Sequence, residues 1–216
     1  MSDNLNTEVY KLNIFFPKLR LFYIENSPFL NGNIDILDTK GNYLDTFNVA
    51  IAIPDNYPYG IPKLKLISHE SIWNDERHIS NEGICCVEID HILTFASKKG
   101  ITLLEFLRNW VYPFLMNQIY FNHAKQFANG EYPHGFEGIQ KFYAVKLGLT
   151  DIHIIVLILK SIINNLVPGN NDPCICGSEK KFKHCHKFSV KYLKDLGRES
   201  ASKDLIEFNK LVLLDK

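Results

Sequence analysis

The five cysteines of this 216-residue chain restrict its fold most, because they fall into two separate clusters. Cys85 and Cys86 are adjacent, whereas Cys174, Cys176 and Cys185 lie near the C-terminus. An odd number of cysteines, in a chain whose polar start does not resemble a secretory signal, is a poor basis for a disulfide framework. The clusters therefore predict reactive or metal-bound thiols, and each poses its own chemical question.

Charge and hydropathy exclude several classes of protein. The 24 Lys+Arg balance the 24 Asp+Glu, which argues against a protein that coats nucleic acid by bulk electrostatics and favours protein partners. The most apolar stretch, Ile152–Leu159, is too short to span a bilayer. We expect a soluble, cytoplasmic protein with no membrane partner.

The hydropathy pattern predicts an α+β fold. Residues 7–23 hold apolar positions and Pro17, which indicates a helix or a helix followed by a turn. Three runs then alternate with the period of a strand, and their spacing predicts an antiparallel meander. The strands are expected at 31–38, 45–54 and 62–68, and helices at 101–128 (bent at Pro113), 138–147 and 151–165, with an amphipathic helix within 189–216.

These elements predict three parts of the chain. The main domain is expected over residues 1–165, and VPGNNDP (167–173) reads as a linker. A small cysteine-rich motif is expected over 166–188, followed by a helical tail over 189–216.

The string NDPCICGSEKKFKHCH (171–186) has metal-ligand spacing. Cys174 and Cys176 are separated by one residue, and Cys185 and His186 follow after eight more, so four ligands can close a tetrahedral zinc site. The string resembles the SEC-C motif at nearly every position. The alternative is a set of free surface thiols, and His184 could replace His186, although the resemblance favours His186.

Two expectations follow for this motif. With four protein ligands no position is left for water, so the zinc is expected to be structural. Lys180, Lys181, Lys183 and Lys187 give the motif a basic face. This face is either a solvated surface or a docking site for an acidic partner or nucleic acid, and a solvated face is the commoner of the two.

Two strings of the central segment are informative: VAIAIPDNYPYGIPKLKL (49–66), a strand, proline-rich turn and strand, and HISNEGICCVEI (78–89). Together they resemble the ubiquitin-conjugating enzyme family in its divergent bacterial form. It covers about residues 7–145. It implies a meander sheet with flanking helices, and a cysteine that carries an acyl group as a thioester.

Aligning Gly83 with the family pattern makes Cys86 the nucleophile, with Cys85 as the alternative. Neighbouring side chains on an extended backbone point to opposite sides, so one thiol should face the cleft and the other the core. The chain departs from the pattern after His78, where Ile79 and Ser80 replace Pro-Asn. The family's oxyanion-stabilising asparagine is thus missing from its place, and Asn81 is a possible substitute.

A second resemblance extends over 118–143, which is similar to a segment of conjugating proteins in bacterial CBASS antiphage systems. It implies that His134 could orient or deprotonate the attacking nucleophile, or be a loop histidine bonded to backbone. His78 is a further candidate catalytic residue, and the role expected for it is to brace the active-site loop.

The two resemblances together imply a ubiquitin-conjugating-like acyl transferase. The acyl donor would be a cGAS-like (CD-NTase) nucleotidyltransferase or a ubiquitin-like protein, and the acceptor a target protein. The chain has no Gly-rich nucleotide loop, so a separate activating enzyme is expected to prepare the acyl group. The alternative is a catalytically inactive adaptor with a zinc-dependent docking motif.

Overall fold

The structure of the chain is a computed structural model that describes residues 2–128, 133 and 135–214. The chain divides into two compact units, Met1–Glu131 and Tyr132–Lys216. Each unit is described by itself.

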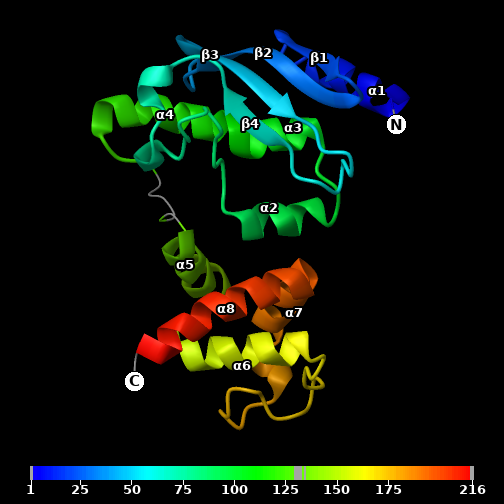
Figure 1. Cartoon of the computed structure of the whole chain (residues 1–216), viewed down its shortest axis with the longest axis vertical. Coiled ribbons are helices and arrows are strands. Elements are labelled where there is room, and N and C mark those ends of the chain that lie inside the picture. Colours follow the sequence, from blue (N-terminus) through cyan, green and yellow to red (C-terminus); the bar gives the residue numbers. More distant parts are fainter. Residues whose placement is uncertain (1, 129–132, 134, 215–216) are drawn as a thin grey trace. The chain divides into compact units, whose positions relative to one another are not determined.

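The first unit combines a four-stranded antiparallel sheet with helices, which confirms the α+β class and the meander (Figure 1). The strands lie in chain order, so each pairs with its sequence neighbour. Their bounds are Leu19–Ile24 (β1), Ser27–Leu37 (β2), Tyr43–Ala52 (β3) and Lys63–Leu66 (β4).

The sequence pattern missed β1. Residues 7–23, expected as helix or helix and turn, contain the end of α1 (Ser2–Leu12) and most of this strand. Pro17 separates the two, because proline has no N–H to continue a helix. Pairing with β2 along its whole length stabilises β1. No clear alternation marks it, since its last three side chains, Phe22, Tyr23 and Ile24, are all exposed.

One face of the sheet carries the core of this unit. Alternate residues of each strand point to that face, as the period of two requires. Helices α1, α3 and α4 contribute side chains to the same core. The buried apolar strand residues are Leu19 from β1, Leu30, Ile34 and Ile36 from β2, Phe47, Val49 and Ile51 from β3, and Leu64 and Leu66 from β4.

The helix expected at 101–128 is one helical rod with a π-helical turn inside it. Thr102 caps its start by a capping box with Glu105. Pro113, where the sequence predicts a bend or restart, lies in the first turn after the π turn. A π-helix is rare and occurs mostly, as here, as a single turn inside an α-helix. The parts are α3 (Leu103–Phe106), η3 (Leu107–Val111) and α4 (Tyr112–Ala124).

Between β4 and this rod the chain forms three short elements that the hydropathy pattern did not reveal. They are two single-turn helices and α2, none longer than eight residues. Elements this short show too few positions for a helical period to be detected. Their bounds are Glu70–Ile72 (η1), Asp75–Arg77 (η2) and Asp90–Ser97 (α2).

The second unit is helical. Its core includes Phe142, Tyr143 and Phe208, and the Tyr143 hydroxyl donates a hydrogen bond of 2.6 Å to the buried Asp204 carboxylate. The tail expected to hold one helix forms two, because Gly197, at φ 105°, ends the first. The helices are α5 (Gly135–Leu147), α6 (Ile152–Ile163), η4 (Phe182–His184), α7 (Lys187–Leu196) and α8 (Arg198–Leu214).

This grouping differs from the domain boundary expected after residue 165. Helix α6 packs against α7 and α8, so α5 and α6 belong with the C-terminal segment and not with the sheet. Across the described ranges, no single helix has the length and apolarity to cross a membrane. Only α5 and α6 taken together, bent by 85°, satisfy that test.

Gly32 gives a test of the β1–β2 pairing. Its φ is +147°, and a Cβ there would overlap the backbone carbonyl of Lys18 just before β1. We expect Gly32→Ala to lower the free energy of unfolding by roughly 3 kcal/mol, since strain and overlap add. Gly41→Ala is the control, because Gly41 also has positive φ but open space around it, and about 1 kcal/mol is expected. Urea denaturation measures both, and equal losses would contradict the close approach.

Candidate metal centre and reactive cysteine

Residues 78–86 fold back on themselves as a short hairpin, which we call the cysteine hairpin. The Cys86 N–H donates to the His78 carbonyl at 2.9 Å, and Ile79 pairs with Cys85. A turn closes it, in which the Gly83 N–H donates to the Ser80 carbonyl at 2.8 Å. Gly83 has φ +81°, which glycine adopts without penalty.

The cysteine hairpin is attached to the sheet at β4. The Cys85 N–H donates to the Leu64 carbonyl at 3.0 Å, and the Leu66 N–H donates to the Gly83 carbonyl at 2.8 Å. Gly83 lies so close to Leu66 and the Trp73 ring that a Cβ would overlap both. The sheet therefore sets the register of the segment that carries both thiols.

The two adjacent thiols lie in different surroundings. Cys85 is partly buried and packs against the core, and Cys86 is exposed, as alternation on an extended backbone requires. Burial raises the pKa of Cys85 to about 12. Desolvation, and then the Asp90 carboxylate, raise the pKa of Cys86 above its ordinary value. Cys86 is thus the more accessible thiol, although its surroundings do not favour the thiolate.

The backbone pairing also places the other predicted site residues. His78 lies opposite Cys86, and its ring contacts the Phe127 ring at 5.7 Å between centroids. Asn81 is exposed in the turn, three residues beyond His78, so the hairpin does not bring it beside Cys86. His134 lies outside the described residues.

A buried arginine that the sequence analysis did not single out holds the start of the cysteine hairpin. Arg77 is only 8% exposed, donates to the Asn122 side-chain carbonyl at 2.8 Å and lies 4.5 Å from the centre of the Phe121 ring. The Gln118 amide of α4 donates to the Arg77 carbonyl at 3.1 Å. Nothing in the local sequence distinguishes this arginine from a surface one, since its partners lie more than forty positions away.

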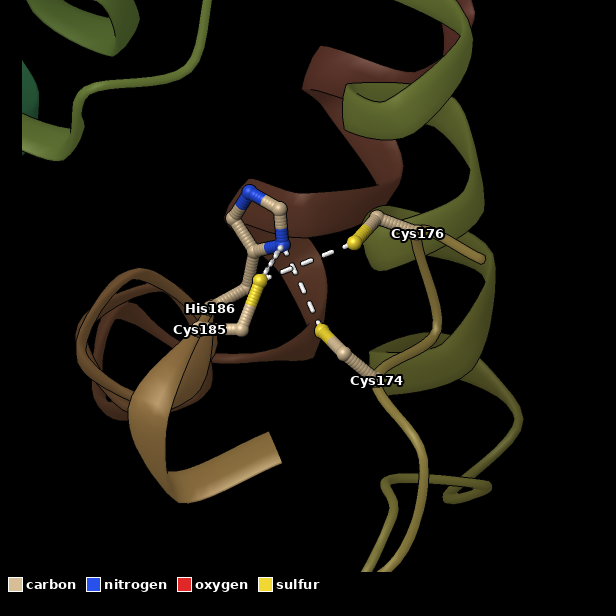
Figure 2. Close-up of side chains that lie close together, drawn as sticks. All are labelled: Cys174, Cys176, Cys185 and His186. Carbon is tan, nitrogen blue, oxygen red and sulfur yellow. Dashed lines mark hydrogen bonds between the residues drawn. The ribbon is translucent and has the colours of Figure 1, made fainter. Parts of the chain in front are cut away.

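The C-terminal cysteines form a tight cluster with His186 (Figure 2). Their four ligand atoms lie within 4.8 Å of one another. The Sγ atoms of Cys176 and Cys185 are 3.6 Å apart, and His186 Nδ1 lies 3.4 Å from Cys174 Sγ and 3.3 Å from Cys185 Sγ. A tetrahedral zinc with ligand bonds near 2.0–2.3 Å places its ligands about 3.6–3.8 Å apart, so this cluster fits such an ion.

Local structure explains how one short segment positions four ligands. Gly177, at φ +76°, closes a turn in which its N–H donates to the Cys174 carbonyl at 3.1 Å. The Cys174 N–H donates to the Lys180 carbonyl at 2.9 Å, so the backbone before this turn and the backbone after it lie opposite each other. Phe182, the first residue of η4, is buried and anchors this single-turn helix, after which Cys185 and His186 follow directly.

The surroundings of the cluster agree with a metal centre in other ways. Burial acts to raise the pKa of Cys176, but hydrogen bonds with Ser178, Cys174 and Cys185 together outweigh it and lower this pKa to about 6, which favours the thiolate that a metal binds. His184, the alternative ligand, is exposed and outside the cluster. The predicted ligand set with His186 is therefore the one that the fold assembles.

Comparison with known proteins agrees with this description of the C-terminal segment. The family model of the SEC-C motif matches residues 171–187, which contain all four ligands. No solved structure matches the chain. The motif and the cluster together indicate a C-terminal site for a metal ion such as zinc. The four lysines of the motif, Lys180, Lys181, Lys183 and Lys187, are all exposed.

The metal centre can be tested with two variants that each replace one histidine, the two histidines being two positions apart in the sequence. The wild-type chain and His184→Ala should each hold about one zinc per chain after dialysis, measured by plasma emission spectrometry. His186→Ala should hold less, because it removes one of the four ligands, and a chelator should unfold the 171–187 segment. Zinc loss in His184→Ala with retention in His186→Ala would contradict the ligand set.

The raised pKa of Cys86 predicts how this thiol reacts. Alkylation by iodoacetamide needs the thiolate, so below the pKa the rate should rise about tenfold per pH unit. Asp90→Asn removes the carboxylate that disfavours the thiolate, and should lower the pKa of Cys86 and speed its alkylation at pH 8. Mass spectrometry in a Cys85→Ala background measures the rate at Cys86.

Glu82→Gln is the matched control for this charge change. Glu82 is an exposed carboxylate in the turn of the cysteine hairpin and is not among the groups that raise the pKa of Cys86. Its rate should equal that of the parent. If Asp90→Asn also leaves the rate unchanged, Asp90 does not control this thiol.

Proposed function

We propose that the chain is a ubiquitin-conjugating-like enzyme that carries an acyl group as a thioester on Cys86. One observation carries the proposal: Cys86 is exposed at the end of a hairpin that is hydrogen bonded to the meander sheet, while Cys85 packs against the core. Of the two thiols in the first unit, Cys86 is thereby the more exposed.

The order of elements supports the proposal. A helix, a four-stranded meander with a proline-rich turn before its last strand, the cysteine segment and further helices follow one another as the resemblance to ubiquitin-conjugating enzymes implies. The turn between β3 and β4 is ordered by Tyr57, whose hydroxyl donates to the Glu8 carboxylate at 2.6 Å and accepts from the Leu103 N–H at 2.8 Å. That turn is therefore tied both to α1 and to the start of the helical rod.

The chemistry requires two transfers at Cys86 Sγ. In loading, the thiolate attacks the carbonyl carbon of an activated C-terminal carboxyl group, an S–C bond forms, and the activating group leaves with its electron pair. In transfer, an amine or hydroxyl of the target attacks the same carbon, the S–C bond breaks and the thiolate is restored, while the nucleophile loses its proton to a base.

The resemblance to CBASS conjugating proteins leads us to propose the partners. The acyl donor is the C-terminal tail of a cGAS-like nucleotidyltransferase or a ubiquitin-like protein, and a separate activating enzyme supplies it. The acceptor is a target protein, and the setting is bacterial antiphage defence in the cytoplasm, where thiols stay reduced. The zinc is structural in this proposal, because four protein ligands leave no open position.

A second candidate function is a catalytically inactive adaptor with the same fold and a zinc-dependent docking motif. The raised pKa of Cys86 favours it, since neither desolvation nor Asp90 helps to form the reactive thiolate. The position of Asn81 in the turn favours it too, because that amide does not flank the thiol.

The two candidates differ in whether a covalent intermediate forms. The full chain is co-expressed with its genomic neighbours, and intact mass and non-reducing gels are used to find a thiol-sensitive adduct. We expect the adduct in the wild type and in Cys85→Ala, its loss in Cys86→Ala, and a thiol-resistant oxyester in Cys86→Ser. The mass of that oxyester identifies the donor.

The cysteine variants also define the results that would contradict the proposal. An adduct that survives Cys86→Ala but not Cys85→Ala would assign the nucleophile to Cys85. No adduct in any variant, with every variant folded by circular dichroism, would support the adaptor instead.

A further inference from the structure

A cavity of about 500 Å³ opens in the first unit, beside the segment that leads into β1. Its volume lies within the range of roughly 300–1,000 Å³ typical of small-molecule sites. Phe16 and Ile34, both buried, contribute to its apolar lining, and the exposed Ile14 and Phe15 also line it. The cysteine hairpin contributes no lining residue, so the cavity is separate from the proposed thioester site.

The charged residues of this cavity leave one positive charge without a partner. Lys18 and Asp35 form an ion pair at 2.6 Å, which neutralises both. The Arg108 guanidinium lies 5.0 Å from the centre of the Phe15 ring, and no carboxylate in the described part of the chain pairs with it. The cavity thus matches a ligand with a single negative charge.

The end of β2 that borders this cavity is closed at its last residue by a side chain of the helical rod. β1 begins at the pair Leu19–Gly32, while β2 continues beyond this pair to Leu37, so the last residues of β2 lack a partner strand on that side. The Tyr112 hydroxyl fills the end of this edge. It accepts from the Leu37 N–H at 2.9 Å and donates to the Leu37 carbonyl at 3.2 Å, so the backbone groups of Leu37 are not free to pair with a further strand.

We propose that this cavity binds a small amphipathic monoanion, a carboxylate with an apolar body. Arg108 would hold the carboxylate by charge-assisted hydrogen bonds, and the ring of Phe15 keeps the guanidinium in place. The apolar body would lie against Phe16, Ile34 and Tyr112. Lys18 stays paired with Asp35 and contributes no net charge.

Titration calorimetry with octanoate and with 1-octanol tests the proposal, because the two probes share an alkyl chain and differ in charge. We expect saturable one-to-one binding of octanoate and at least tenfold weaker binding of octanol. Arg108→Gln should weaken octanoate binding by about tenfold and leave octanol unchanged, since a hydrogen-bonded charge pair is lost. Backbone amide shifts in NMR spectra should move at residues 14–18, 33–37 and 108–112.

Two further variants make the test specific. Arg198→Gln removes the same charge from an exposed position in the second unit and should bind octanoate like the wild type. Ile14→Glu places a negative charge at a position that is 73% exposed, so it should fold normally and repel octanoate. Absent or non-saturable octanoate binding, equal affinity for both probes, or unchanged affinity in Arg108→Gln would each overturn the proposal.

Discussion

The backbone pairing between β4 and the cysteine hairpin is the constraint on which the chemistry of the first unit depends. Because side chains alternate along a paired segment, the bond between the Cys85 N–H and the Leu64 carbonyl turns Cys85 toward the core and Cys86 outward. A slip of one residue would exchange the two thiols. Gly83 protects against that slip, since its tight contact with Leu66 and Trp73 excludes any larger residue.

The two units are stabilised in different ways. The first buries the alternating apolar residues of its sheet beneath helices, which is the usual solution for a sheet with one solvated face. The second is stabilised by packing between aromatic residues of α5 and α8, such as Tyr143 and Phe208, whose ring centres are 4.9 Å apart. Its cysteine segment has little core beyond Phe182, so a bound metal would supply most of what holds that segment in one conformation.

The sequence revealed what is encoded locally. Alternation predicted β2, β3 and β4, and ligand spacing predicted the cluster of Cys174, Cys176, Cys185 and His186, because each lies within one short window. It did not reveal β1, whose exposed end shows no alternation, or α2, which is too short for a period. Arg77 and Asp90 were also missed, since a buried contact with α4 and a charge beside a thiol depend on the tertiary fold.

The helical rod from α3 through α4 connects features that the chain order keeps apart. Arg108 in its π turn lines the cavity, and Asn122 near its end holds Arg77 at the base of the cysteine hairpin. The two positions are separated by roughly 21 Å of helix, at 1.5 Å per residue. Since a helix resists compression along its axis, the rod acts as a spacer of fixed length. The distance between the cavity and the cysteine hairpin is therefore set by this one rod and not by the loops between them.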